Sequence, residues 1–86
     1  MITFKYNYKG ETFQATASHF MDDGYHRYRI HTDDLHFTIG PSRYQTPSGA
    51  IIWFHANTYG QPDQPHDLTQ AIGEGLQSEI SLIFVR

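Results

Sequence analysis

Residues 2–17 read ITFKYNYKGETFQATA, and their pattern is the strongest indication of the fold class. Apolar and polar residues alternate strictly over residues 2–8, and Phe13, Ala15 and Ala17 continue this pattern after Lys9-Gly10, which is the period of a half-buried β-strand. A two-residue turn at Lys9-Gly10 places Phe4 opposite Ala15, so that every apolar side chain falls on one side. We therefore predict an antiparallel β-hairpin with one apolar face.

A second hairpin follows the same alternation. Its strands are predicted at residues 25–32 and 35–39, with their apolar side chains on one face. Pairing across a two-residue turn puts His31 opposite His36, with Cβ atoms about 4.5–5.5 Å apart. The loop at residues 21–24 is predicted to join the hairpins into a four-stranded meander, because its glycine supplies the positive φ that such a turn needs.

The pattern changes after the fourth strand. Gly40 and Pro41 are predicted to end that strand, and residues 42–49 to be irregular. A fifth strand is predicted at residues 50–56, and both of its faces are apolar. Residues 80–85 either prolong the helix before them or form a last strand, and their β-branched and aromatic content favours the strand.

A helix is predicted near the C-terminus because Leu68, Ala71, Ile72 and Leu76 recur at helical spacing. Gly73 and Gly75 each cost a helix about 1 kcal/mol relative to alanine, so they mark an early end or a close approach to another element. Gly75 falls on the apolar face of this helix. We predict that the helix crosses the sheet there, over the small side chains of Ala15 and Ala17.

These elements predict an α+β fold in a single small domain over residues 1–86. The domain is an antiparallel β-meander of about five strands, with one C-terminal helix packed on one sheet face and a last strand after it. A chain of 86 residues buries only about 60% of its unfolded surface, which leaves room for one core.

Composition excludes several kinds of chemistry. The chain has no cysteine, which rules out disulfides, thiolate metal sites and a cysteine nucleophile. Its net charge of -3 disfavours nucleic acid and anionic membranes as partners. No apolar run approaches the ~20 residues that span a bilayer, and Met1 leads directly into the strand pattern, so the cytoplasm is the expected location.

One face of the predicted meander collects basic side chains and carries no acid. Its candidate binding residues are Lys5, Arg27, Arg29, His31 and His36, and this donor-rich surface suits an anion or an acidic partner. Phe4, Tyr6, Tyr28 and Phe37 fall on the opposite face, which disfavours base stacking on the basic face and therefore RNA. The alternative is a solvated face that keeps the sheet soluble.

The two histidines of this face are also candidate zinc ligands. A structural zinc site takes four ligands, however, and the sequence offers no second pair of comparable clarity. We therefore predict no metal and no other cofactor.

Trp53 is a further candidate binding residue. With Tyr44 and Tyr59 it flanks the two long loops, where these rings either line an aromatic pocket or pack in the core. No nucleophile with a base, paired carboxylates or phosphate-binding loop has an informative spacing, so no catalytic residue is predicted.

The two apolar faces of strand five leave more hydrophobic surface than one helix covers. The sequence therefore predicts a small interaction module that forms a homo-oligomer or binds a protein partner. The alternative is a protein that binds a small ligand, an anion or a metal on the polar sheet face, through Arg27, Arg29, His31 and His36. An enzyme without a recognisable motif ranks third.

Overall fold

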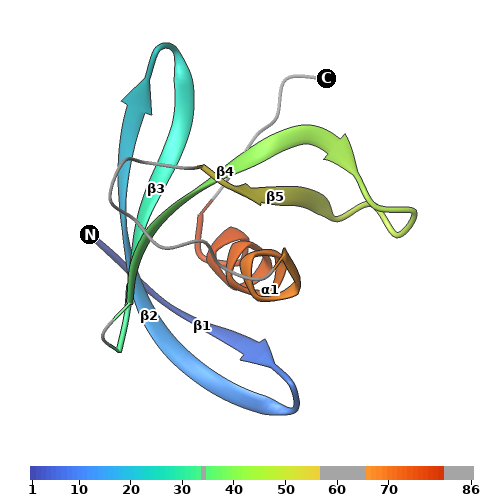
Figure 1. Cartoon of the computed structure of the whole chain (residues 1–86). Helices are drawn as coiled ribbons and strands as arrows, with labels where there is room; N and C mark the ends of the chain where they lie inside the picture. Colours follow the sequence, from blue (N-terminus) through green and yellow to red (C-terminus); the bar gives the residue numbers. More distant parts are fainter. Residues whose placement is uncertain (34, 57–65, 81–86) are drawn as a thin grey trace.

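The computed structural model describes residues 1–33, 35–56 and 66–80, and in these residues five antiparallel strands curl around one helix (Figure 1). The strands lie side by side in chain order. The elements are β1 (Ile2–Tyr8), β2 (Glu11–Asp22), β3 (Tyr25–Thr32), β4 (Leu35–Gln45), β5 (Ile51–His55) and α1 (His66–Gln77). The predicted α+β meander with a C-terminal helix is confirmed.

The predicted register of the hairpins is also confirmed. Phe4 lies opposite Ala15 in the β1–β2 pair, and His31 lies opposite His36 in the β3–β4 pair. Lys9 and Gly10 both have positive φ, at 50° and 80°, which is the geometry of a two-residue turn that matches the twist of its strands. The β2–β3 turn is tighter than the loop predicted at residues 21–24, because β2 continues to Asp22.

The prediction for the end of β4 is wrong. β4 does not stop at Gly40 and Pro41 but continues to Gln45, pairing with β5 through a register shift between Pro41 and Gln45. Beyond Ile39 this strand pairs with β5 alone, because its pairing with β3 runs only from Leu35 to Ile39. A proline without an N–H group is tolerated in such an edge segment and at a bulge.

The core lies between the inner face of the curled sheet and α1. Its largest fully buried side chains include Trp53, Phe4, Phe37, Ile30 and Ile72. These residues come from β1, β3, β4, β5 and α1, so each of these elements contributes its apolar side to one cluster. The period of two along the strands and the helical spacing of α1 therefore meet in a single core.

The two helix glycines are needed for close packing. A Cβ atom at Gly73 would overlap the indole ring of Trp53, and one at Gly75 would overlap the backbone oxygen of Lys5. The close approach predicted for Gly75 exists, but its partner is β1 and not Ala15 and Ala17 of β2. The reason is the curl of the sheet, which brings its two edge strands, β1 and β5, against the helix (Figure 1).

Gln70 of α1 also binds the backbone of the edge strand β5. Its amide nitrogen donates to the Ile51 carbonyl at 2.8 Å, and its oxygen accepts from the Trp53 N–H at 2.9 Å. This side chain thus satisfies two backbone groups that an edge strand would otherwise leave open.

The C-terminal strand predicted at residues 80–85 falls almost wholly outside the described residues. Ile80 itself is described and follows a turn, in which its N–H donates to the Gln77 carbonyl at 3.4 Å. No helix within the described residues has the length and apolarity that a membrane crossing requires.

Candidate functional site

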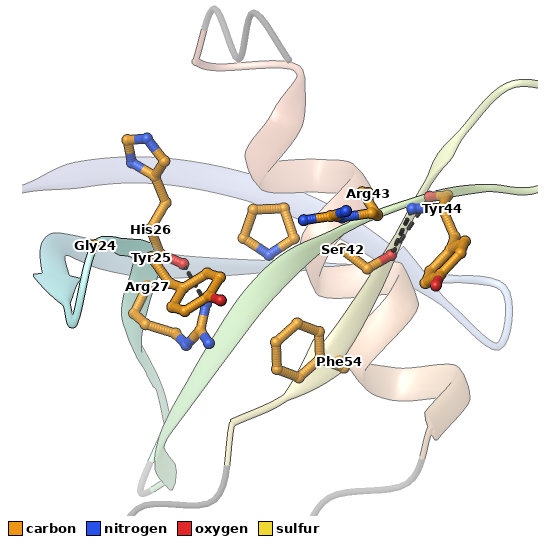
Figure 2. Close-up of a pocket in the computed structure, with 9 residues that line it drawn as sticks. Gly24, Tyr25, His26, Arg27, Ser42, Arg43, Tyr44 and Phe54 are labelled. Carbon is orange, nitrogen blue, oxygen red and sulfur yellow. Dashed lines mark hydrogen bonds between the residues drawn. The ribbon is translucent and has the colours of Figure 1, made fainter. Parts of the chain in front are cut away.

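A pocket of about 430 Å³ opens beside the β2–β3 turn. Residues 24–27 form one wall, residues 41–44 of β4 form the other, and Phe54 of β5 lies between them (Figure 2). After Ile39, β4 no longer pairs with β3, and its register against β5 shifts between Pro41 and Gln45. The pocket lies between this second half of β4 and the start of β3. Its existence therefore depends on the extension of β4 past Pro41.

The Arg27 guanidinium lies within cation–π distance of two aromatic rings that line the pocket. Its guanidinium carbon is 5.3 Å from the ring centre of Tyr25 and 5.0 Å from that of Phe54. A Cβ atom at Gly40 would come within 2.9 Å of Arg27 Nη1 and 3.1 Å of the Phe54 ring, so a side chain there would press on this contact. Arg27 Nη1 also donates to the His26 carbonyl at 2.8 Å, which adds a hydrogen bond to the two ring contacts of the guanidinium.

Ser42 stabilises the backbone of the opposite wall, residues 41–44. Its hydroxyl oxygen accepts a hydrogen bond from the Tyr44 N–H at 3.1 Å, which replaces a ladder bond inside the bulge. Arg43 and Tyr44 are exposed, and Tyr44 retains 69% of its accessible surface. Two cations and two accessible tyrosine rings therefore face a common space.

The electrostatics of the pocket favour an anion. No aspartate or glutamate is found among its described lining residues, and within the described chain neither Arg27 nor Arg43 forms an ion pair. Because β2 continues to Asp22, which pairs with Tyr25, this acid lies on the same face as Arg27, so the prediction of a face without acids is wrong. Asp22 and Asp23 border the pocket but do not line it. A guanidinium presents a planar fork of donors that fits a carboxylate or a phosphate, and it also stacks on aromatic rings.

The predicted binding residues of the basic face do not form one site. Only Arg27 lines the pocket. Arg29 lies two residues away along β3 and stacks over the ring of Phe20, with 5.2 Å from its guanidinium carbon to the ring centre. His31 and His36 are neighbours, as predicted, with ring centres 4.3 Å apart, but they lie at the other end of β3.

Lys5 and Trp53 lie farther from the pocket. Lys5 pairs with Gln14, six residues along β2 from the partner of Arg27, which corresponds to about 20 Å. It lines a second hollow of about 300 Å³ that Glu79 also lines, so its surroundings are not free of acid. Trp53 is fully buried against Gly73, which gives it a core position away from any surface ligand.

Metal binding was predicted to be absent because four ligands are lacking. Within the described residues, no group of three or more histidine, cysteine, aspartate or glutamate side chains could hold a metal ion. Tyr59, the third ring of the predicted aromatic pocket, lies outside the described residues.

The comparisons with known proteins add no assignment. No family model matches the chain, and no match was found among curated proteins or solved structures.

Sequence reasoning missed the combination of Arg43 with Tyr25 and Phe54. Tyr25 and Arg27 follow each other at the strand period, and alternation puts Phe54 on the face of strand five opposite to Trp53, so part of the signal is present in the sequence. The missing piece was the β4–β5 register, which puts Phe54 opposite Gly40. A glycine in a strand marks a close approach of another group, and here that group is Arg27.

Proposed function

We propose that this protein binds a small anionic ligand that carries a flat ring, in the pocket between the β2–β3 turn and the second half of β4. The observation that carries the proposal is the pairing of Arg27 and Arg43 with aromatic rings in a space that no described carboxylate lines. Ligand pockets typically measure about 300–1,000 Å³, and this one falls within that range.

The two walls suit different parts of such a ligand. Arg27 contacts two rings and the His26 carbonyl, and it offers its remaining donors to a ligand. Arg43 is exposed and free of an ion pair within the described chain, so it closes on the same carboxylate or phosphate from the opposite wall. The exposed rings of Tyr25 and Tyr44 are available to a flat aromatic group.

Three probe compounds distinguish the contribution of the ligand's ring from that of its negative charge. Adenosine 5′-monophosphate carries both the ring and the anion, adenosine carries only the ring, and inorganic phosphate carries only the charge. We expect the monophosphate to perturb the amide signals of residues 24–27 and 41–44 in an NMR titration, and to bind more tightly than either fragment. Benzoate tests whether a carboxylate replaces the phosphate.

Arg43→Gln and Arg29→Gln form a matched pair of variants. Both remove one cation from an exposed side chain, but only Arg43 lines the pocket. Loss of one charged hydrogen-bond partner costs about 1.5–3 kcal/mol, or roughly ten- to a hundredfold in affinity. We expect this loss in Arg43→Gln alone. Equal weakening in both variants, or no response to any probe, would refute the proposal.

Self-association through β5 is the second candidate. It is favoured by Ile52 and Phe54, which remain only half-buried on the side of β5 that faces away from α1. It is disfavoured by Gln70, which already bonds the backbone of Ile51 and Trp53 at the strand edge. Light scattering across a concentration series tests it, and a mass near 10.0 kDa at all concentrations would exclude a stable homo-oligomer.

A further inference from the structure

The tip of the β2–β3 hairpin carries three side chains with donor atoms that suit a metal, on the face opposite to Tyr25 and Arg27, although His26 also borders the pocket. Met21 lies directly opposite His26 in the ladder, and His19 lies opposite Tyr28, so His19, Met21 and His26 share one face. This is the face that continues into the core through Tyr28. At the tip, however, these three side chains are exposed.

The two imidazoles already point their nitrogens at each other. His19 Nε2 and His26 Nδ1 are 2.8 Å apart, with ring centres 5.0 Å apart. The Tyr28 ring, 5.1 Å from that of His19, supports His19 from the side of the core. A metal ion about 2.0–2.1 Å from each nitrogen needs them about 3.3–3.6 Å apart, so the site forms by opening this contact by less than about 1 Å.

Met21 lies where its sulfur can reach the two imidazoles as a third donor. A directly opposed pair in an antiparallel ladder has Cβ atoms about 4.5–5.5 Å apart, and methionine has three rotatable bonds with which to bring its sulfur to a neighbour. Met21 keeps 52% of its surface exposed, so no core contact holds its thioether away.

We propose that His19, Met21 and His26 bind a copper(I) ion. Thioether sulfur is a soft ligand that selects Cu(I), whereas Ca²⁺ and Mg²⁺ prefer oxygen and structural Zn²⁺ sites take four ligands, commonly thiolates and imidazoles. The described residues contain no group of three harder ligands that would direct zinc here. The other histidine pair, His31 and His36, has no methionine opposite or beside it in the β3–β4 pairing, and its two rings lie edge to face. It therefore serves as an internal control.

The first test uses the unmodified protein. Cu(I) is added under anaerobic, reducing conditions in competition with the chelator bicinchoninate, and binding is expected at one ion per chain. In NMR spectra, the ring signals of His19 and His26 and the methyl signal of Met21 should shift. Met1, the only other methionine, and the pair His31 and His36 should not. Absence of binding, or shifts confined to His31 and His36, would overturn the proposal.

Variants then assign the donors. His26→Gln and Met21→Leu should each weaken Cu(I) binding by at least about tenfold, because each removes one ligand from the ion. His36→Gln is the matched control and should bind as the parent does. Met21→Leu that binds Cu(I) with parental affinity, or a parent that prefers Zn²⁺, would refute the thioether site.

The copper proposal and the anion-pocket proposal can be refuted independently of each other. Arg43→Gln leaves all three copper ligands intact, so Cu(I) binding should be unchanged in that variant whatever becomes of the anion pocket. Folding of every variant is checked by circular dichroism, and the unmodified protein tests the site without any substitution.

Discussion

The two faces of one curled sheet use alternate residues of the same strands in different ways. On the inner face, Phe37 and Trp53 are fully buried and the helix approaches so closely that Gly73 has no room for a side chain. On the outer face, Arg27 and Arg29 lie over aromatic rings and remain in contact with solvent.

This difference separates stability from binding within a very short chain. The inner face gains its free energy from removing apolar surface from water, which requires close packing without voids. The outer face keeps its charges hydrated and gains little from their contacts, so its residues are available to a ligand. Neighbouring positions of one strand should therefore respond very differently to substitution.

The largest contrast is expected between Phe37→Ala and His36→Ala. Truncating the fully buried Phe37 leaves a cavity and should lower the free energy of unfolding by about 3–5 kcal/mol. The exposed His36 should change it by less than about 0.5 kcal/mol. Urea denaturation followed by Trp53 fluorescence measures both. A similar decrease in the free energy of unfolding in both variants would contradict the proposed difference between the two faces.

Gly73→Ala should have the next largest effect. A methyl group at this position overlaps the Trp53 ring, and overpacking of a core typically costs about 1–3 kcal/mol. Alanine is favoured over glycine in a helix by about 1 kcal/mol, so an increase in stability would show that propensity outweighs packing here. The same substitution in a Trp53→Phe background should cost less, because a smaller ring relieves the overlap.

High pH should weaken the inner face through Tyr28. Burial raises the pKa of this phenol above its ordinary value of 10.0, so in strongly alkaline solution the unfolded chain loses its proton before the folded chain does. The free energy of unfolding therefore falls as the pH rises above about 10, by at most about 1.4 kcal/mol per pH unit for this group. Tyr28→Phe should reduce the slope of stability against pH, whereas the exposed Tyr25→Phe should not.

Gly40→Ala should have the smallest effect on stability and a clear effect on the pocket. Its methyl group would displace Arg27 from Phe54, and an exposed cation–π contact contributes about 0.5–1 kcal/mol. The side-chain NMR signals of Arg27 should shift and binding of adenosine 5′-monophosphate should weaken. Ser18→Ala, on the same face outside the pocket, is the control. An unchanged Arg27 signal would show that Gly40 does not hold the guanidinium in place.

The hairpins were predictable because their information is local. The alternation around Lys9-Gly10 allows only one register that buries Phe4 with Ala15, since a slip of one residue moves every side chain to the other face. The neighbouring positions of His31 and His36 followed from the same rule. The end of β4 was not predictable, because Gly40 and Pro41 break a central strand but are tolerated in a segment that pairs on one side only.

The meander, its inner and outer residues and the covering helix follow from the sequence, because apolar residues recur with a period of two in the strands and 3.6 in the helix. That Arg27 of β3, Arg43 of β4 and Phe54 of β5 share a pocket is visible only in the folded chain. These three residues come together because the sheet curls and the register of β4 shifts, and neither feature produces a recognisable periodicity in the sequence. The same holds for Gly73, whose missing side chain matters only because Trp53 occupies that space.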